Sequence, residues 1–192
     1  MIIYLHGFRS GPQSAKAQQL LAHMQARGLG DRLWCGQLPP VPAEAIALAE
    51  QQIRAAVRMN GTPPTIVGSS LGGFYATWLA EQHRLRAVLV NPFVPHAGFD
   101  GELFIGRHTN LYDGSEFDFT REHMAQIAAM DVPQPRRPEN LWLLAEEDDE
   151  VLDTRHAVAR YAGARQTVLP GGDHSFTRWE DYLDGILAFA GL

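Results

Sequence analysis

Short apolar runs alternate with longer helical stretches along the chain, and this order constrains the fold more than any other feature. The runs typical of buried strands stand at residues 2–5, 33–38, 65–67, 87–90, 141–145 and 167–169. Helical patterns separate them, as at 43–59, where apolar residues recur at helical spacing. Parallel strands need such crossovers. The order therefore predicts a three-layer α/β sandwich with a mostly or fully parallel sheet of about six strands.

Composition limits the class of protein further. The 192 residues suffice for one domain with a substantial core, so we expect a single domain over residues 1–192. A net charge of −6 and the lack of a basic, aromatic-rich cluster argue against nucleic-acid binding. The single cysteine, Cys35, suits a reducing compartment. No apolar run approaches the ~20 residues of a membrane span, and no basic leader precedes the first strand, so we expect a cytoplasmic protein.

One long segment, from about Pro92 to Pro138, breaks the alternation of strands and helices. It has little strand pattern, although residues 122–130 fit a helix. Its aromatic residues are Phe93, Phe99, Phe104, Tyr112, Phe117 and Phe119. Long connections in compact domains commonly serve as lids or binding loops, so we expect a small cap over residues 92–138. The alternative, that these aromatic side chains form a small core of their own, is compatible with a cap.

The most informative motif is Gly68-Ser69-Ser70-Leu71-Gly72, which follows the apolar run at 65–67 and precedes a helical stretch. It matches G-x-S-x-G, in which the central serine occupies a sharp strand-to-helix turn with its hydroxyl exposed. Glycine on either side avoids side-chain clashes in such a turn. Ser70 is therefore the candidate nucleophile. The alternative is a glycine- and serine-rich loop that only turns the chain.

A serine hydroxyl is a poor nucleophile until a base accepts its proton, and His174 is the best candidate for that base. It lies in the glycine-containing loop 171–176, after the last expected strand and before the last helix. That position fits the chain order serine, acid, histidine. The remaining histidines lie in helical stretches, in the insertion or beside the first strand.

The acid that orients His174 must come from the acidic run at 146–150, which follows the fifth expected strand. Asp149 is favoured, because Val151 and Leu152 follow at a distance suited to anchoring its loop in the core. Asp148 is the alternative. A charge run of this kind otherwise indicates a solvated loop.

Acyl transfer also needs two backbone N–H groups that bind the developing oxyanion. Leu71, the residue after the nucleophile, supplies one candidate, and Phe8, in the loop after the first strand, supplies the other. His6 is expected to pin this loop, and Gly7 allows close approach of the backbone. The candidate substrate contacts are His6, Gly7, Phe93 and His96.

No metal or cofactor is expected. The sequence contains no H-E-x-x-H motif, no paired cysteines and no two histidines at short ligand spacing. The glycine-rich phosphate-binding motifs are also absent.

Together these stretches resemble the YqiA-like esterases, a family of compact α/β-hydrolases. The similarity covers nearly the whole chain, and its most specific segments are 4–8, 66–73, 76–79, 90–92, 149–153 and 171–174. The resemblance implies a compact α/β-hydrolase fold with Ser70, Asp149 and His174 at the family's triad positions. The chain departs from the family at Asp148, where a glycine is usual, and at Asp173, where an asparagine is common.

These observations predict a serine hydrolase of the carboxylesterase or thioesterase type. Its substrate would be a small-molecule carboxylic ester, hydrolysed through a Ser-His-Asp triad and an acyl-enzyme intermediate. An acyl thioesterase, a lactonase and a carbon–carbon bond hydrolase remain alternatives, since one triad serves all of them. Outside catalysis, the alternative is an acyl-binding module that keeps the hydrolase fold. Both a monomer and a homodimer fit the sequence.

Overall fold

Six parallel strands form the central sheet of the computed structural model, which describes all of residues 1–192. The strands are β1 (Ile2–Leu5), β2 (Leu33–Trp34), β3 (Thr65–Ser69), β4 (Ala87–Val90), β7 (Leu141–Glu146) and β8 (Arg165–Leu169). They lie in the order β2-β1-β3-β4-β7-β8, and every neighbouring pair is parallel. The predicted strand number and direction are therefore confirmed.

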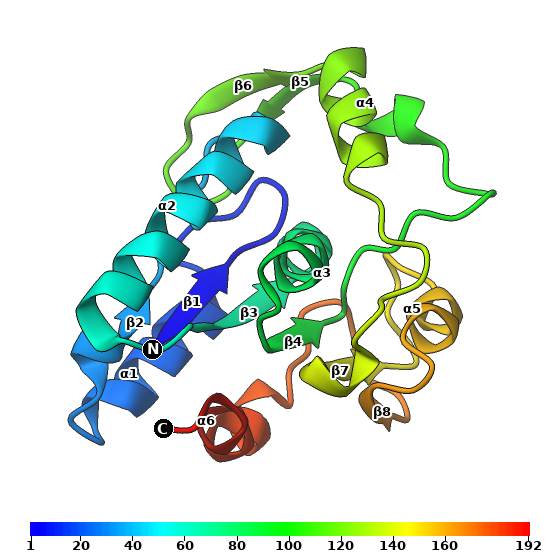
Figure 1. The fold of residues 1–192 in the computed structure, drawn as a ribbon. Coiled ribbons are helices and arrows are strands. Elements are labelled where there is room, and N and C mark those ends of the chain that lie inside the picture. The colour runs from blue at the N-terminus through cyan, green and yellow to red at the C-terminus, as the bar shows by residue number, and fades with distance from the viewer.

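Helices cover both faces of the sheet (Figure 1). They are α1 (Ala15–Gln25), α2 (Pro42–Asn60), α3 (Leu71–His83), α5 (Thr154–Arg160) and α6 (Leu183–Ala190). Single 3-10 turns lie at η1 (Gly30–Arg32), η3 (Pro138–Asn140) and η4 (Trp179–Tyr182). Ile3 and Leu5 of β1 join one apolar cluster with α2, α3 and α5, whereas Ile2 and Tyr4 join a second cluster with α1 and α6. Alternate residues of a strand point to opposite faces, which gives the three layers.

None of the helices combines the length and apolarity that crossing a bilayer requires.

Strand β2 is shorter than the run at 33–38 predicts, because it ends at Trp34. Beyond it the chain bends toward the loop after β1, where the Leu38 N–H donates a hydrogen bond to His6 Nε2 at 3.0 Å. Pro39, which has no N–H to donate, follows directly. The residues after Trp34 therefore bind a loop instead of a neighbouring strand.

The segment at 92–138 contains more regular structure than its sequence predicts. It comprises the 3-10 turn η2 (Gly101–Phe104), the antiparallel strands β5 (Gly106–Thr109) and β6 (Glu116–Phe119), and α4 (Arg121–Ala129). The helix agrees with the expectation at 122–130, whereas the hairpin was not expected. Figure 1 shows β5, β6 and α4 gathered at one end of the molecule, where α4 contacts α2.

Candidate active site

The carboxyl ends of the parallel strands bring four loops to one edge of the sheet. The loop after β1 carries Phe8, the turn after β3 carries Ser70, and the loops after β7 and β8 carry Asp149 and His174. Open α/β sheets bind ligands at this edge. Segments separated by most of the chain thus meet in one small region.

Ser70 occupies the sharp turn that the glycine motif predicts. Its backbone has φ 56° and ψ −120°, a conformation that non-glycine residues rarely adopt. A Cβ at Gly68 would overlap the Gly72 carbonyl, and a Cβ at Gly72 would overlap the Leu5 carbonyl. Glycine is therefore required at both positions, because the start of α3 lies too close to β3 at Gly68 and to β1 at Gly72 for a side chain.

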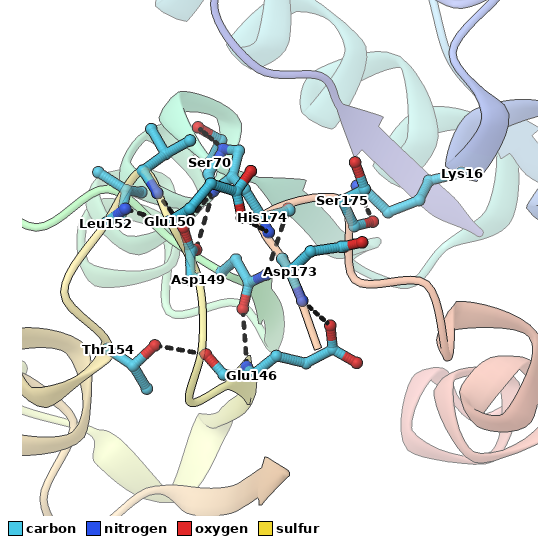
Figure 2. Close-up of polar contacts among 12 residues, drawn as sticks. Lys16, Ser70, Glu146, Asp149, Glu150, Leu152, Thr154, Asp173, His174 and Ser175 are labelled. Carbon is cyan, nitrogen blue, oxygen red and sulfur yellow. Dashed lines mark hydrogen bonds and ion pairs between the residues drawn. The ribbon is translucent and has the colours of Figure 1, made fainter. Parts of the chain in front are cut away.

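A chain of contacts joins Ser70, His174 and Asp149 (Figure 2). His174 Nε2 lies 3.1 Å from Ser70 Oγ, and His174 Nδ1 lies 2.8 Å from Asp149 Oδ2. Asp149 can only accept a hydrogen bond here, so the proton is assigned to Nδ1 and Nε2 is left to accept from the serine hydroxyl. The Asp149 side chain is 1% exposed and that of His174 is 22% exposed, so the acid is shielded while the base stays accessible.

The structure distinguishes between the two candidate acids. Asp148 is exposed, and its carboxylate forms no hydrogen bond, whereas Asp149 contacts His174. The expected anchoring of the Asp149 loop is half right, because Leu152 packs against the core cluster while Val151 is 58% exposed. The backbone N–H groups of Val151 and Leu152 donate to Asp149 Oδ1 at 2.9 and 2.8 Å. These hydrogen bonds fix the carboxylate through Oδ1, which also lies 3.0 Å from His174 Nδ1.

Phe8 and Leu71 lie beside Ser70, the candidate nucleophile, with free backbone N–H groups. The Phe8 N–H donates no hydrogen bond, and Leu71 is the first residue of α3, where helix N–H groups have no intrahelical acceptor. Both residues line a cavity that contains Ser70. Gly7 lets the two loops approach, since a Cβ there would lie 3.2 Å from Ser70 Cβ.

His6 is buried, with 5% of its surface exposed, and both of its ring nitrogens are engaged by the backbone. Nε2 accepts from the Leu38 N–H, so the Nδ1–H donates to the Gly7 carbonyl at 3.1 Å. Burial lowers the pKa of His6, and the hydrogen bond to Gly7 opposes this shift. His6 thus pins the loop after β1 and has no free nitrogen for a substrate.

The two substrate candidates in the insertion have different positions. Phe93 lines the same cavity as Ser70. His96 does not line either cavity that contains Ser70; its ring stacks on that of His156 with centroids 3.8 Å apart. Its Nδ1 accepts a hydrogen bond from the Gly98 N–H at 3.2 Å. The expected contact between substrate and His96 therefore has no support in the geometry.

Sequence reasoning missed a buried network under the histidine loop. The Glu146 carboxylate has no exposed surface and accepts hydrogen bonds from Arg178 Nε at 2.7 Å and from the Asp173 N–H at 2.8 Å. Asn91 Oδ1 accepts from the Glu146 N–H, and Asn91 Nδ2 donates to the Asp173 and His174 carbonyls. The run at 146–150 gave no sign that its first member is buried. Asn91-Pro92 marked only the end of a strand.

Lys16 was also missed, although it is the only lysine in the chain. It lies in the first turn of α1, and its Nζ donates to the Ser175 carbonyl at 2.7 Å, next to the candidate base (Figure 2). Burial lowers the pKa of the Lys16 ammonium, and the nearby carboxylates, chiefly that of Asp173, oppose this shift. No signal in the sequence pointed to Lys16, because its contact with Ser175 joins segments near opposite ends of the chain.

No group of three or more histidine, cysteine, aspartate or glutamate side chains is arranged to hold a metal ion. Burial raises the pKa of the Cys35 thiol to about 12, so a thiolate nucleophile is not available there at neutral pH.

The architecture, with a sharp strand-to-helix turn after β3, is that of the α/β-hydrolases. Est1E from Butyrivibrio proteoclasticus has a TM-score of 0.66 at 13% identity, over 100% of this chain and 88% of that chain. A monoacylglycerol lipase from Paleococcus ferrophilus has a TM-score of 0.68 at 14% identity, over 98% of this chain and 93% of that one. The esterase domain of a Rhodothermus marinus protein has a TM-score of 0.65 at 16% identity, over 98% and 85%. At these identities the likeness establishes the fold.

The sequence profile of uncharacterised protein family UPF0227 matches residues 1–191, and the chain belongs to this family. The resemblance to the YqiA-like esterases is thereby confirmed.

Proposed function

We propose that the protein is a serine esterase that hydrolyses small-molecule acyl esters through an acyl-enzyme intermediate. The observation that carries the proposal is the continuous contact from Ser70 Oγ to His174 Nε2, at 3.1 Å, and from His174 Nδ1 to Asp149, at 2.8 Å. Both distances lie within the range required of a nucleophile and its base. Similar folds in an esterase domain and in a monoacylglycerol lipase support the same class of reaction.

In the proposed mechanism Ser70 Oγ attacks the acyl carbonyl carbon, while His174 Nε2 accepts the hydroxyl proton. Asp149 keeps the Nδ1–H of His174 in place and stabilises the imidazolium. The N–H groups of Phe8 and Leu71 bind the oxyanion, assisted by the N-terminus of α3. His174 then returns the proton to the departing alcohol or thiol, and water, activated by the same histidine, releases the acid.

We further propose that residues 92–138 act as a cap on a single hydrolase domain. Phe99, Phe104, Phe119 and Met124 of this segment line the apolar cavity at Ser70. Burial of an acyl group against these side chains would exclude water from the apolar side of the ester carbonyl while Ser70 attacks it.

The test of the proposed function is intact-mass analysis after incubation with a fluorophosphonate, for wild type and Ser70→Ala. We expect one adduct on wild type and none on Ser70→Ala, because only an activated serine reacts. Ser69→Ala is the matched control, since it removes the neighbouring hydroxyl and should still be labelled. Absence of an adduct on wild type would refute a catalytic serine and favour an acyl-binding module.

Two steady-state assays then separate esterase from thioesterase. The same acyl group is presented as an oxygen ester and as a thioester, and kcat/KM is measured for each. A higher value for the oxygen ester supports the proposal, whereas a higher value for the thioester favours an acyl thioesterase.

A further inference from the structure

Two cavities of opposite character meet at Ser70. The first, of about 60 Å³, is almost wholly apolar and includes Leu71, Phe93 and Phe119. The second, of about 370 Å³, is lined by many polar groups and includes Lys16, His174 and Ser175. Ser70 and Phe8 line both. A substrate attacked by Ser70 would therefore have one part in each cavity.

The positions of His174 and Leu71 decide which part lies where. His174 lines the polar cavity only, and the group that receives its proton must lie within hydrogen-bond reach of Nε2. Of the two cavities that contain Ser70, Leu71, a proposed oxyanion donor, lines the apolar one and not the polar one. The leaving group thus extends into the polar cavity, and the acyl group extends into the apolar one. The small apolar volume suits a short acyl chain.

The polar cavity has the character of an anion site. Lys16 is a charged residue of its lining, and no aspartate or glutamate lines it. One of the three donors of the Lys16 ammonium is used by the Ser175 carbonyl, at 2.7 Å, so two remain. Lysine with free donors is a common partner of carboxylate and phosphate groups.

The N-terminus of α1 faces the same cavity and adds to its positive character. Ser14, the N-cap residue, and Ala15, the first helical residue, both line it. The Ser14 side chain does not cap the helix, so the first N–H groups of α1 have no side-chain acceptor. Ser14 is 8% exposed, and its Oγ lies near the Tyr4 phenol without meeting any partner at hydrogen-bond geometry. Free N–H groups at a helix N-terminus attract anions.

We propose that the polar cavity binds an anionic group, a carboxylate or a phosphate, on the leaving-group side of the substrate, with Lys16 as its principal partner. The protein would then prefer esters that join a short acyl group to an alcohol or thiol bearing a negative charge. This inference rests on the proposed esterase function for the orientation of the substrate.

The test compares two acetyl esters that differ in one charge, 4-acetoxybenzoate and its methyl ester. The value of kcat/KM for each is measured in wild type, in Lys16→Met and in Arg58→Met. Methionine keeps the apolar stem of lysine and removes its ammonium. Arg58, exposed in the last turn of α2 and free of ion pairs, is the control for loss of one positive charge away from the cavity.

Lys16→Met should lower kcat/KM about tenfold more for 4-acetoxybenzoate than for its methyl ester. A tenfold change corresponds to the lower end of the free energy that a hydrogen bond to a charged group contributes. The ratio of the two losses cancels any difference in chemical reactivity between the esters. Arg58→Met should lower both equally. Equal losses for both esters in Lys16→Met would overturn the proposal and leave Lys16 as a positioning residue that holds the histidine loop through Ser175.

A binding measurement separates this inference from the proposed function. Calorimetric titration of 4-hydroxybenzoate into Ser70→Ala reports the anion site without turnover, and adding Lys16→Met should weaken the affinity about tenfold. If wild type neither reacts with a fluorophosphonate nor hydrolyses either ester, the proposed function fails, while this titration still decides the anion site. Affinity that is unchanged by Lys16→Met would refute the anion site alone.

Discussion

The buried carboxylate of Glu146 provides a quantitative test of how the histidine loop is held. Its two oxygens accept from Arg178 Nε at 2.7 Å and from the Asp173 N–H at 2.8 Å. In Glu146→Gln the side chain keeps one acceptor oxygen and gains an NH₂ group, so one of the two donors faces another donor. A hydrogen bond to a charged group contributes roughly 1.5–3 kcal/mol. The Arg178 side chain is 35% exposed, so water offsets part of the loss, and we expect destabilisation of about 2 kcal/mol.

Equilibrium unfolding in urea, followed by circular dichroism, measures this change in the free energy of unfolding. Glu147→Gln is the matched control, because it makes the same chemical change one residue later in an exposed side chain that forms no hydrogen bond. The control should lower the free energy of unfolding by less than about 0.5 kcal/mol. If Glu146→Gln also changes it by less than about 0.5 kcal/mol, the reasoning is refuted, and the network does not hold the loop.

Three further predictions concern the acid, the turn and the loop after β1. Asp149→Asn should lower kcat for an activated ester on the order of 10³–10⁴-fold, because an amide neither fixes the Nδ1–H tautomer of His174 nor stabilises the imidazolium. Asp148→Asn should leave kcat nearly unchanged, and equal losses would contradict the assignment of the acid. Gly72→Ala places a Cβ against the Leu5 carbonyl, so urea unfolding should show a free energy of unfolding lower by at least about 2 kcal/mol. A variant as stable as wild type would show that the turn can relax to accept the side chain. Because the pKa of His6 is lowered in the folded state, the unfolded chain binds its proton more readily, and stability falls as pH decreases through about 6.5. His6→Gln should reduce that fall between about pH 7.5 and 5.5 in urea titrations, and an unchanged slope would exclude His6 as its source.

Strands buried on both faces were the most predictable part of the fold. β1 and β4 begin and end at the expected residues, because every residue of both strands is apolar and fully enclosed by helices. A continuous apolar run is typical of central parallel strands. The edge strand β2 was predicted too long, since Cys35 and Leu38 extend the apolar pattern beyond Trp34, where the strand ends.

The hairpin of β5 and β6 was missed because only one of its strands carries a strand pattern. In β6, Phe117 and Phe119 alternate with acidic residues, and both pack edge-on against Phe8. In β5, by contrast, three of the four residues are exposed and none is an apolar residue that could pack in a core. The hairpin is held to the molecule by aromatic contacts with the loop after β1. Contacts of this kind depend on tertiary structure and leave no periodic signal in the sequence.

The acidic run at 146–150 shows how far a local pattern can determine a site. The sequence placed the run after a strand, in a pattern typical of a solvated loop, whereas its first member, Glu146, is the last residue of β7. Three of its carboxylates instead bind three donors of one loop: Glu146 accepts from the Asp173 N–H, Glu150 from the His174 N–H, and Asp149 from the His174 Nδ1–H. Of these three, the Glu146 and Asp149 side chains are shielded from solvent, whereas Glu150 is exposed, as are the remaining two carboxylates, which accept no hydrogen bond. Which carboxylates accept a hydrogen bond is therefore set by a loop more than twenty residues away along the chain. Two consecutive residues of that loop, Asp173 and His174, supply all three donors, while the acceptors at 146, 149 and 150 are unevenly spaced along the run.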